Sequence, residues 1–405
     1  MTLSSRKMID PGSARRVGPG LLTFLAAISV LGPLSMSILL AGLPQMADTL
    51  ATTEGGTQAS LSACVVGLAV GQLFAGPLSD TVGRRLPLVA GLGVWTLATF
   101  ACAVAPNIET MIAFRAVQGL TGGIGMALGR AVIRDLTEGE ELIRQYARLG
   151  AASGVAPILS PLLGSLVMLF APWQGVFVFL GAIGVALTAY AAFGYRESLP
   201  ESRRRTPRPR ELVADYRDML RDPRFVWPCL VVAFSYAAMF SYVLSSSFIY
   251  SSAYGLTGIL FSILFGINGA GFAIASNMGG RLALRFGVRR VVLSAFPVAA
   301  AACAMMAVLW WAGVREWPAL AACLFVMVAA LGVTMPLGVA WAMRSQPDRA
   351  GAASGVLGVT QFAIGGIVGP LVSIVNAPGP LGLALVAASS IAVASVSALG
   401  MARRH

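Results

Sequence analysis

Long apolar stretches alternate with short polar ones along almost the whole chain, and this pattern predicts transmembrane helices. Each apolar stretch has about 20 residues, enough for a helix to cross about 30 Å of hydrocarbon. Strands of a membrane barrel would instead alternate apolar and polar residues over about ten positions, a pattern that the sequence lacks. We therefore predict an all-α membrane protein with twelve spans, at approximately 20–44, 57–78, 86–105, 109–131, 145–170, 174–195, 225–250, 258–280, 289–312, 318–342, 350–375 and 380–402.

The arginines between these spans occur in alternate loops, which predicts an orientation. One set of loops is rich in basic residues: Arg84 and Arg85, then Arg134, Arg144 and Arg148, then the segment 196–224, then Arg281, Arg285, Arg289 and Arg290, and finally Arg344 and Arg349. The opposite loops hold mainly acids, with Arg315 as the only basic residue. Because cytoplasmic loops carry the excess of Lys and Arg, we expect both termini in the cytoplasm.

The segment 196–224 is the longest polar stretch, and it divides the chain into two halves of six spans. We expect an N-terminal half at 1–195, a basic cytoplasmic linker at 196–224 and a C-terminal half at 225–405. The halves resemble each other, since a Gly and two arginines follow the second span at 83–85 and recur within 287–290 after the eighth. Two related halves of this kind form a substrate path at their interface and rock against each other.

Composition supports the membrane assignment and removes several classes of function. The chain is 57% hydrophobic and 11% charged, whereas soluble domains have about 25% charged residues. The net charge of +12 lies in short loops, which argues against a nucleic-acid partner. The five cysteines lie inside apolar stretches without metal-ligand spacing, and the single histidine is the last residue, His405. We expect no metal, no cofactor and no internal histidine chemistry.

A charged, glycine-containing turn between the second and third predicted spans is the most informative motif. Residues 76–85 read Gly-Pro-Leu-Ser-Asp-Thr-Val-Gly-Arg-Arg. An acid at a helix end can pair with basic or helix-terminal partners, and glycine permits a sharp turn and close helix approach. We interpret the turn as a conformational latch between helices that later slide apart. The candidates are Gly76, Asp80, Gly83, Arg84 and Arg85.

Three further motifs complete a resemblance to a known family. They are Arg115-Ala116-Val117-Gln118-Gly119 in the fourth span, residues 154–164 in the fifth, and Ser245–Leu256 at the end of the seventh. With residues 76–85, they make residues 20–400 similar to a major facilitator superfamily transporter of the twelve-helix drug-efflux type. The Ser245–Leu256 stretch and Asn268 resemble in particular the Bcr/CflA branch, named for bicyclomycin and chloramphenicol resistance. Thr81 and Ser247 replace an arginine and a proline that the branch usually carries.

The resemblance implies roles for individual residues. Arg115 would lie near the substrate cavity and influence proton coupling, and an arginine this deep in a span should face the bundle interior. Arg134 and Asp135 would belong to the latch. The proline- and glycine-rich fifth span is associated with exporters, through Gly154, Pro157, Pro161 and Gly164. The resemblance also implies the bacterial inner membrane, proton antiport and a monomer.

One departure from the family concerns the first span. Ser37 stands where the branch carries an aspartate, and all seventeen acids of the chain lie in tails, loops or span ends. With Arg115 unopposed, we expect a net positive cavity that prefers neutral, zwitterionic or anionic substrates. The membrane potential would drive an anion outward by about 2.3 kcal/mol per charge per 100 mV.

Eight residues are candidates for the cavity wall: Ser37, Arg115, Gln118, Met239, Tyr242, Asn268, Met335 and Gln361. Methionine and aromatic side chains adapt to varied apolar ligands. Ordinary helix packing explains Met239, Tyr242 and Met335 equally well.

The predicted function is secondary active export of small organic molecules by alternating access. The alternative is an exporter dedicated to one endogenous metabolite or self-made product, driven by voltage. A membrane-embedded enzyme would need clusters of His, Asp or Cys on facing helices, and the sequence provides none, so we do not expect an enzyme. The expected partners are the substrate, membrane lipid and protons.

Overall fold

The computed structural model describes residues 18–137, 141, 145, 148, 149, 156, 159–204, 217–346, 350–375 and 377–400, and the ordered elements in these ranges are helices. The first elements are α1 (Pro19–Ser37), η2 (Leu40–Gly42), α2 (Leu43–Thr49), α3 (Glu54–Val82), α4 (Arg85–Ala103), α5 (Ile108–Leu136), α7 (Trp173–Ala189), η3 (Tyr190–Gly194) and η4 (Glu201–Arg203). They are followed by α9 (Pro223–Tyr254), α10 (Gly258–Phe286), α11 (Val288–Trp311), α12 (Trp317–Arg344), α13 (Ala350–Val368), α14 (Leu371–Val375) and α15 (Leu381–Gly400).

Within the described ranges, eleven helical segments are long and apolar enough to cross a membrane. Each corresponds to one of the predicted spans. The remaining predicted span, 145–170, lies largely outside the described residues, and its visible part is helical at 159–167. The prediction of an all-α, multi-pass membrane protein is confirmed.

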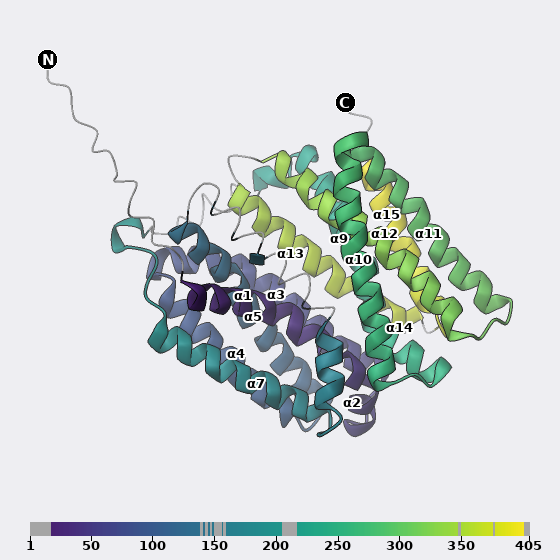
Figure 1. Ribbon diagram of the computed structural model, residues 1–405, viewed down its shortest axis with the longest axis horizontal. Helices are drawn as coiled ribbons and strands as arrows, with labels where there is room; N and C mark the ends of the chain where they lie inside the picture. Colours follow the sequence, from purple (N-terminus) through teal and green to yellow (C-terminus); the bar gives the residue numbers. More distant parts are fainter. Residues whose placement is uncertain are drawn as a thin grey trace, which may run out of the picture.

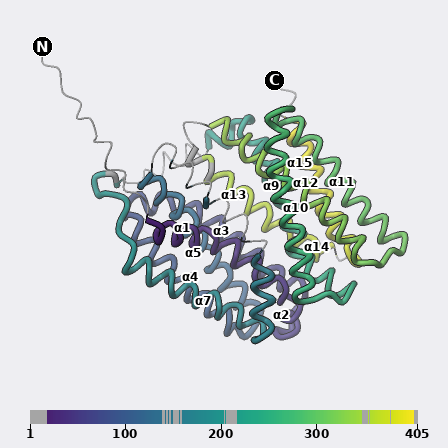
Figure 2. Tube along the Cα trace, in the orientation of Figure 1, coloured from purple at the N-terminus to yellow at the C-terminus, as the bar shows by residue number. Residues whose placement is uncertain are grey.

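The helices pack into two groups that lie side by side (Figures 1 and 2). In the first group α5 packs against α1, α3 and α4, and α4 packs against α7. In the second group α9 packs against α12, α13 and α15, while α12 also contacts α10 and α11. The groups meet mainly along α3 and α13. They correspond to the two expected halves, but whether the halves act as separate units stays a prediction.

Glycines bring α3 and α5 unusually close together. A Cβ atom added at Gly67 or Gly71 of α3 would overlap the backbone of α5, and one added at Gly119 or Gly123 of α5 would overlap the backbone of α3. Helices in a membrane gain little from apolar burial, so this close backbone approach supplies the van der Waals contact that holds the pair. The first group of helices is therefore built around the α3–α5 contact.

The first predicted span, 20–44, is not one continuous helix. α1 ends at Ser37, and the chain turns through Ile38 and Leu39 before η2 and α2. Pro44 occupies the first turn of α2, where its missing N–H costs nothing, so a new helix starts there. Gly164 of the helical segment 159–167 lies against the Ile38 carbonyl, and any larger residue would overlap it. After the break, η2 packs against α9 and α10 of the second group, and α2 packs against α9.

Candidate functional site

A cavity of about 260 Å³ lies where the two groups of helices meet. Its wall is formed by α1, α3 and α5 of the first group and by α9, α10, α12 and α13 of the second. Sixteen described residues line it, and none of them is Asp, Glu, Lys or Arg. The cavity is therefore an uncharged space shared by both groups.

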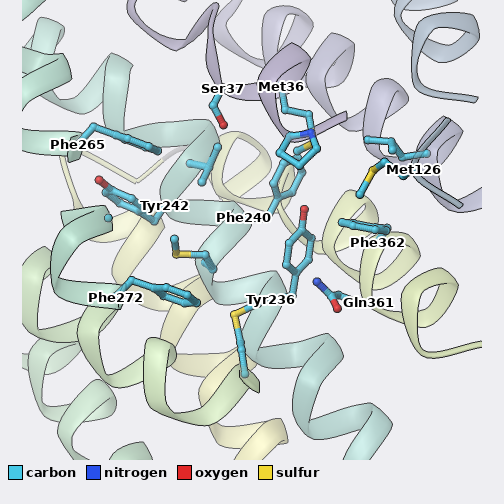
Figure 3. Close-up of a pocket in the computed structure, with 16 residues that line it drawn as sticks. Met36, Ser37, Met126, Tyr236, Phe240, Tyr242, Phe265, Phe272, Gln361 and Phe362 are labelled. Carbon is cyan, nitrogen blue, oxygen red and sulfur yellow. The ribbon is translucent and has the colours of Figure 1, made fainter. Parts of the chain in front are cut away.

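Aromatic rings form most of the wall on the side of the second group. They are Tyr236, Phe240 and Tyr242 from α9, Phe265 and Phe272 from α10, and Phe362 from α13. Figure 3 shows these rings arranged around the same space. Tyr236 stacks on Phe240 with ring centroids 5.8 Å apart and meets Phe362 edge-on at 5.2 Å. Such mutual contacts hold the rings in position to receive an apolar ligand.

Methionines and a few polar atoms complete the wall. The methionines are Met36, Met126, Met239 and Met335, and their flexible thioethers let a wall fit ligands of different shape. The polar side chains, apart from the two tyrosine hydroxyls, are Ser37 and Gln361. This combination suits molecules that are mainly apolar and make a small number of hydrogen bonds.

Five of the eight residues predicted for the cavity wall line this cavity: Ser37, Met239, Tyr242, Met335 and Gln361. Asn268 lies behind the wall, where its side-chain amide donates a 2.8 Å hydrogen bond to the Tyr242 hydroxyl. Arg115 and Gln118 are completely buried among the helices of the first group and do not line the cavity. Neither residue is therefore part of the wall, and the effect of the Arg115 charge on the cavity stays a prediction.

Sequence reasoning missed most of the aromatic wall. Tyr236, Phe240 and Val243 recur at helical spacing on α9, as do Phe265, Gly269 and Phe272 on α10. This periodicity is a signal for one helix face. It does not say whether that face meets lipid, another helix or a cavity, so only the structure identifies it as a binding surface.

Polar contacts join the two groups at one end of the cavity, which we call the Gln58 end. The Ser373 hydroxyl donates to Gln58 Oε1 at 2.6 Å, and Gln58 Nε2 donates to Glu54 Oε1 at 2.8 Å. Ser165 and Ser262 share a 2.6 Å hydrogen bond, and Ser262 also bonds the Pro161 carbonyl at 2.9 Å. Direct contacts at this end thus join α14 to α3 and α10 to the helical segment 159–167.

The predicted latch occupies the opposite end, which we call the Asp80 end. Its first half is not a turn, because α3 continues to Val82. Gly76 also marks no close approach of helices, since a Cβ added there would meet no atom within 4 Å. The turn itself is confined to residues 83–84, where Gly83 has φ 93°, a conformation that favours glycine. The expected turn at Gly76 is wrong, and the one at Gly83 is present.

Arg84 is the centre of the charged contacts at the Asp80 end. Its guanidinium is 2% exposed and pairs with Asp80 at 2.7 Å and with Asp135 of α5 at 2.8 Å. Burial disfavours the charged form, but Asp135 and Asp80 outweigh that effect and raise the pKa of Arg84 above its usual value. These contacts tie α3, α4 and α5 together within the first group.

Glu197 also belongs to this cluster, although sequence reasoning did not select it. Its carboxylate accepts the backbone N–H groups of Arg84 at 2.9 Å and Arg85 at 3.1 Å, at the start of α4, and that of Leu199 at 3.0 Å. Partial burial raises the pKa of Glu197, but the three N–H donors outweigh it, so the pKa lies below its usual value. A Cβ at Gly83 would lie 2.5 Å from this carboxylate.

The remaining predicted residues are distributed between both ends. The Arg85 guanidinium donates to the Ala192 carbonyl at 2.6 Å, and Arg134 is exposed at the end of α5. Pro161 and Gly164 face the second group and the break after α1, respectively. Gly154 and Pro157 lie outside the described residues.

The described residues offer no metal centre. No group of three or more His, Cys, Asp or Glu side chains in the described ranges is placed to hold a metal ion. What the geometry provides is a shaped, uncharged cavity between two helix groups, with polar contacts at one end and a charged cluster at the other.

Comparisons with known proteins agree with this arrangement. Residues 25–370 match the family model described as the Major Facilitator Superfamily. The chain is 35% identical over 356 residues to the uncharacterized MFS-type transporter YdgK of Bacillus subtilis (strain 168), covering 86% of this chain and 87% of the relative. It is 28% identical over 379 residues to multidrug resistance protein D of Escherichia coli (strain K12), covering 91% and 93%.

Two further matches concern the branch and the fold. The chain is 24% identical over 349 residues to the bicyclomycin resistance protein homolog of Haemophilus influenzae, covering 86% of this chain and 87% of the relative. A solved bacterial homolog of the human lysosomal transporter Spinster, in an inward-facing and unoccupied conformation, superposes with a TM-score of 0.69 at 14% identity, covering 97% and 96%. The chain belongs to the Major Facilitator Superfamily.

Proposed function

We propose that this transporter exports small, uncharged, largely apolar molecules, and that aromatic compounds are its preferred substrates. The observation that carries the proposal is the cavity wall, which combines six aromatic rings and four methionines with no charged side chain. A charged ligand would lose its hydration there without gaining a counter-charge, which costs several kcal/mol or more. The names of two relatives, multidrug resistance protein D and a bicyclomycin resistance protein homolog, favour export as the direction of transport.

Transport would proceed by alternating access, with the two helix groups rocking about the cavity. The Gln58 end is held by contacts between the groups, whereas the described ion pairs of the Asp80 end stay within the first group. This asymmetry supports a state that is closed at the Gln58 end. Because the arginine-rich loops lie toward the Asp80 end, we place that end and both termini in the cytoplasm, with the protein in the inner membrane.

The family resemblance, and not the cavity, indicates which energy source drives transport. Proton antiport is what the resemblance implies, and no carboxylate lines the cavity among the described residues. Any coupling proton would therefore bind away from the substrate. Flux measured with a pH gradient and a membrane potential imposed separately would identify the driving force.

The experiment that tests the function measures efflux of a neutral aromatic dye from proteoliposomes. The test variants are Tyr236→Ala and Phe362→Ala, which remove facing rings of the wall. The matched control is Phe193→Ala, since Phe193 is 91% exposed and lies away from the cavity. We expect each wall variant to raise the half-saturating concentration about tenfold, equivalent to about 1.4 kcal/mol, and the control to leave it unchanged. Equal effects of wall and control variants would contradict the proposal.

A further inference from the structure

Two polar side chains of the cavity wall have hydrogen-bonding groups that the protein itself does not use. Tyr236 and Gln361 line the cavity, and no described residue forms a hydrogen bond with either side chain. Tyr242 differs, because its hydroxyl accepts the 2.8 Å hydrogen bond from Asn268. A tyrosine hydroxyl can donate and accept, and a glutamine amide has two N–H donors and a carbonyl acceptor. Both residues are therefore free to bind a ligand.

A ligand in the cavity can reach both groups. Other polar atoms without a partner, such as the hydroxyls of Ser246 and Tyr250, are completely enclosed by protein. Tyr236 and Gln361 are only half-buried, and they border a space of about 260 Å³. Their free hydrogen-bonding groups thus belong to the binding surface and not to a sealed part of the core.

Packing holds the Tyr236 hydroxyl in one place. The ring stacks on Phe240 at 5.8 Å and meets Phe362 edge-on at 5.2 Å, and a Cβ added at Gly365 of α13 would lie 2.5 Å from it. In Figure 3 the hydroxyl points toward the first group of helices, and Gln361 lies on the same side of the cavity as Tyr236 and Phe362. A donor fixed in this way loses little freedom when a ligand binds, which favours affinity.

A purely apolar ligand would leave these two groups without partners. Filling the cavity displaces water from Tyr236 and Gln361, and a buried polar group that lacks a partner weakens binding about 5- to 150-fold. A ligand with an acceptor atom at this place restores the hydrogen bonds. The wall therefore disfavours hydrocarbons through its free polar groups, just as it disfavours ions through its lack of counter-charges.

We propose that Tyr236 and Gln361 determine substrate specificity by binding a carbonyl oxygen of a neutral aromatic substrate. A carbonyl oxygen has two lone pairs, so it can accept from the Tyr236 hydroxyl and from the Gln361 amide together. The two residues lie on α9 and α13, which pack against each other in the second group. This inference rests on the proposed function, and it names which aromatic compounds the cavity prefers.

The test compares two planar aromatic compounds that differ in one group. Fluorenone has a carbonyl where fluorene has a methylene group, and neither is charged. Binding of the radiolabelled compounds to the purified full chain gives two dissociation constants. We expect fluorenone to bind about tenfold more tightly than fluorene, the value for one or two net hydrogen bonds.

Three variants assign this preference to residues. Tyr236→Phe removes the hydroxyl and keeps the ring contacts, and Gln361→Met keeps the side-chain length in a wall that already contains methionines. Each should reduce the tenfold preference to about threefold. The matched control is Tyr250→Phe, which removes an enclosed hydroxyl from the same helix away from the cavity and should keep the full preference.

The outcomes separate this inference from the proposed function. Absence of binding by both compounds would refute the aromatic cavity as a binding site, and the inference with it. Equal binding of both to the wild-type chain would refute only the role of Tyr236 and Gln361. A preference that is lost in Ser37→Ala and kept in Tyr236→Phe would place the polar contact on the first group and overturn the proposal.

A second measurement needs no variant and covers the case in which a variant fails to fold. The infrared carbonyl stretch of fluorenone bound to the wild-type chain should lie at lower frequency than in an alkane solvent, because hydrogen bonds weaken the C=O bond. A band at the alkane frequency would mean that no donor reaches the oxygen, and it would refute the proposal.

Discussion

Removing the hydrogen bond between Ser373 and Gln58 tests directly whether this contact holds the Gln58 end closed. Ser373 belongs to α14 of the second group and Gln58 to α3 of the first, and the 2.6 Å contact joins them. Gln58 is 0% exposed, so Ser373→Ala leaves its side-chain oxygen buried without that donor. In an open state the same oxygen would bond to water, so the loss acts only on the closed state.

The expected change in the ratio of closed to open molecules follows from the free-energy cost of a buried acceptor without a donor. That cost is about 1–3 kcal/mol, and taking the lower part of the range gives about a 5- to 30-fold decrease in the ratio of closed to open molecules. Ser165 and Ser262 still join the groups in the variant, so we expect a shift of the equilibrium and not a complete opening.

Distances between two spin labels can measure this shift. Glu109→Cys on α5 and Pro378→Cys before α15 place exposed labels on the two groups at the Gln58 end. The five native cysteines are buried, which favours labelling of the two introduced ones. The matched control is Ser389→Ala, because the exposed Ser389 hydroxyl bonds only to its own helix, at the Leu385 carbonyl.

The expected result is a longer distance population that grows in Ser373→Ala and not in Ser389→Ala. If both variants gave the distance distribution of the parent protein, the contact would not hold this end closed and the reasoning would be refuted.

Three further predictions concern packing, pH and the charged cluster. Gly119→Ala should destabilise the protein by about 1–3 kcal/mol in denaturation assays, because its Cβ would overlap the Cys64 carbonyl, whereas Gly76→Ala should have little effect. The pKa of Glu197 is lowered from 4.5, so its stabilising contribution is present above that pH and is lost as the pH falls through its lower folded value. Thermal unfolding of wild type and Glu197→Gln should therefore differ above pH 4.5, and the difference should shrink as the pH falls through the lower folded pKa of Glu197; a constant difference would contradict this. Arg84→Gln should slow transport more than it weakens substrate binding, and an equal loss of both would count against a role in the conformational change.

Much of the fold is predictable because a bilayer demands long apolar helices. That requirement identifies the spans, and the cost of burying a charge places Arg115 inside the bundle. Neither argument says which interior space Arg115 occupies, and it lies behind the cavity instead of on its wall. Similarly, Tyr236 and Phe193 are both aromatic residues of membrane helices, yet Tyr236 lines the cavity and Phe193 is exposed.

Glu197 shows a different limit of sequence reasoning. Two of its three N–H donors lie 112 and 113 residues earlier in the chain, and residue types do not reveal a contact with a backbone N–H. The turn at Gly83 was predictable from glycine itself, whereas the carboxylate that caps the following helix was not. The family resemblance therefore predicts the general mechanism, and the structure adds contacts that sequence reasoning does not identify.

An uncharged aromatic cavity should select uncharged apolar molecules. The most direct measurement compares efflux from proteoliposomes of two fluorescent compounds of equal size and shape, one neutral and one carrying a fixed positive charge. We expect efficient efflux of the neutral compound, sensitive to Tyr236→Ala, and little efflux of the cation. Equal or faster efflux of the cation would contradict it.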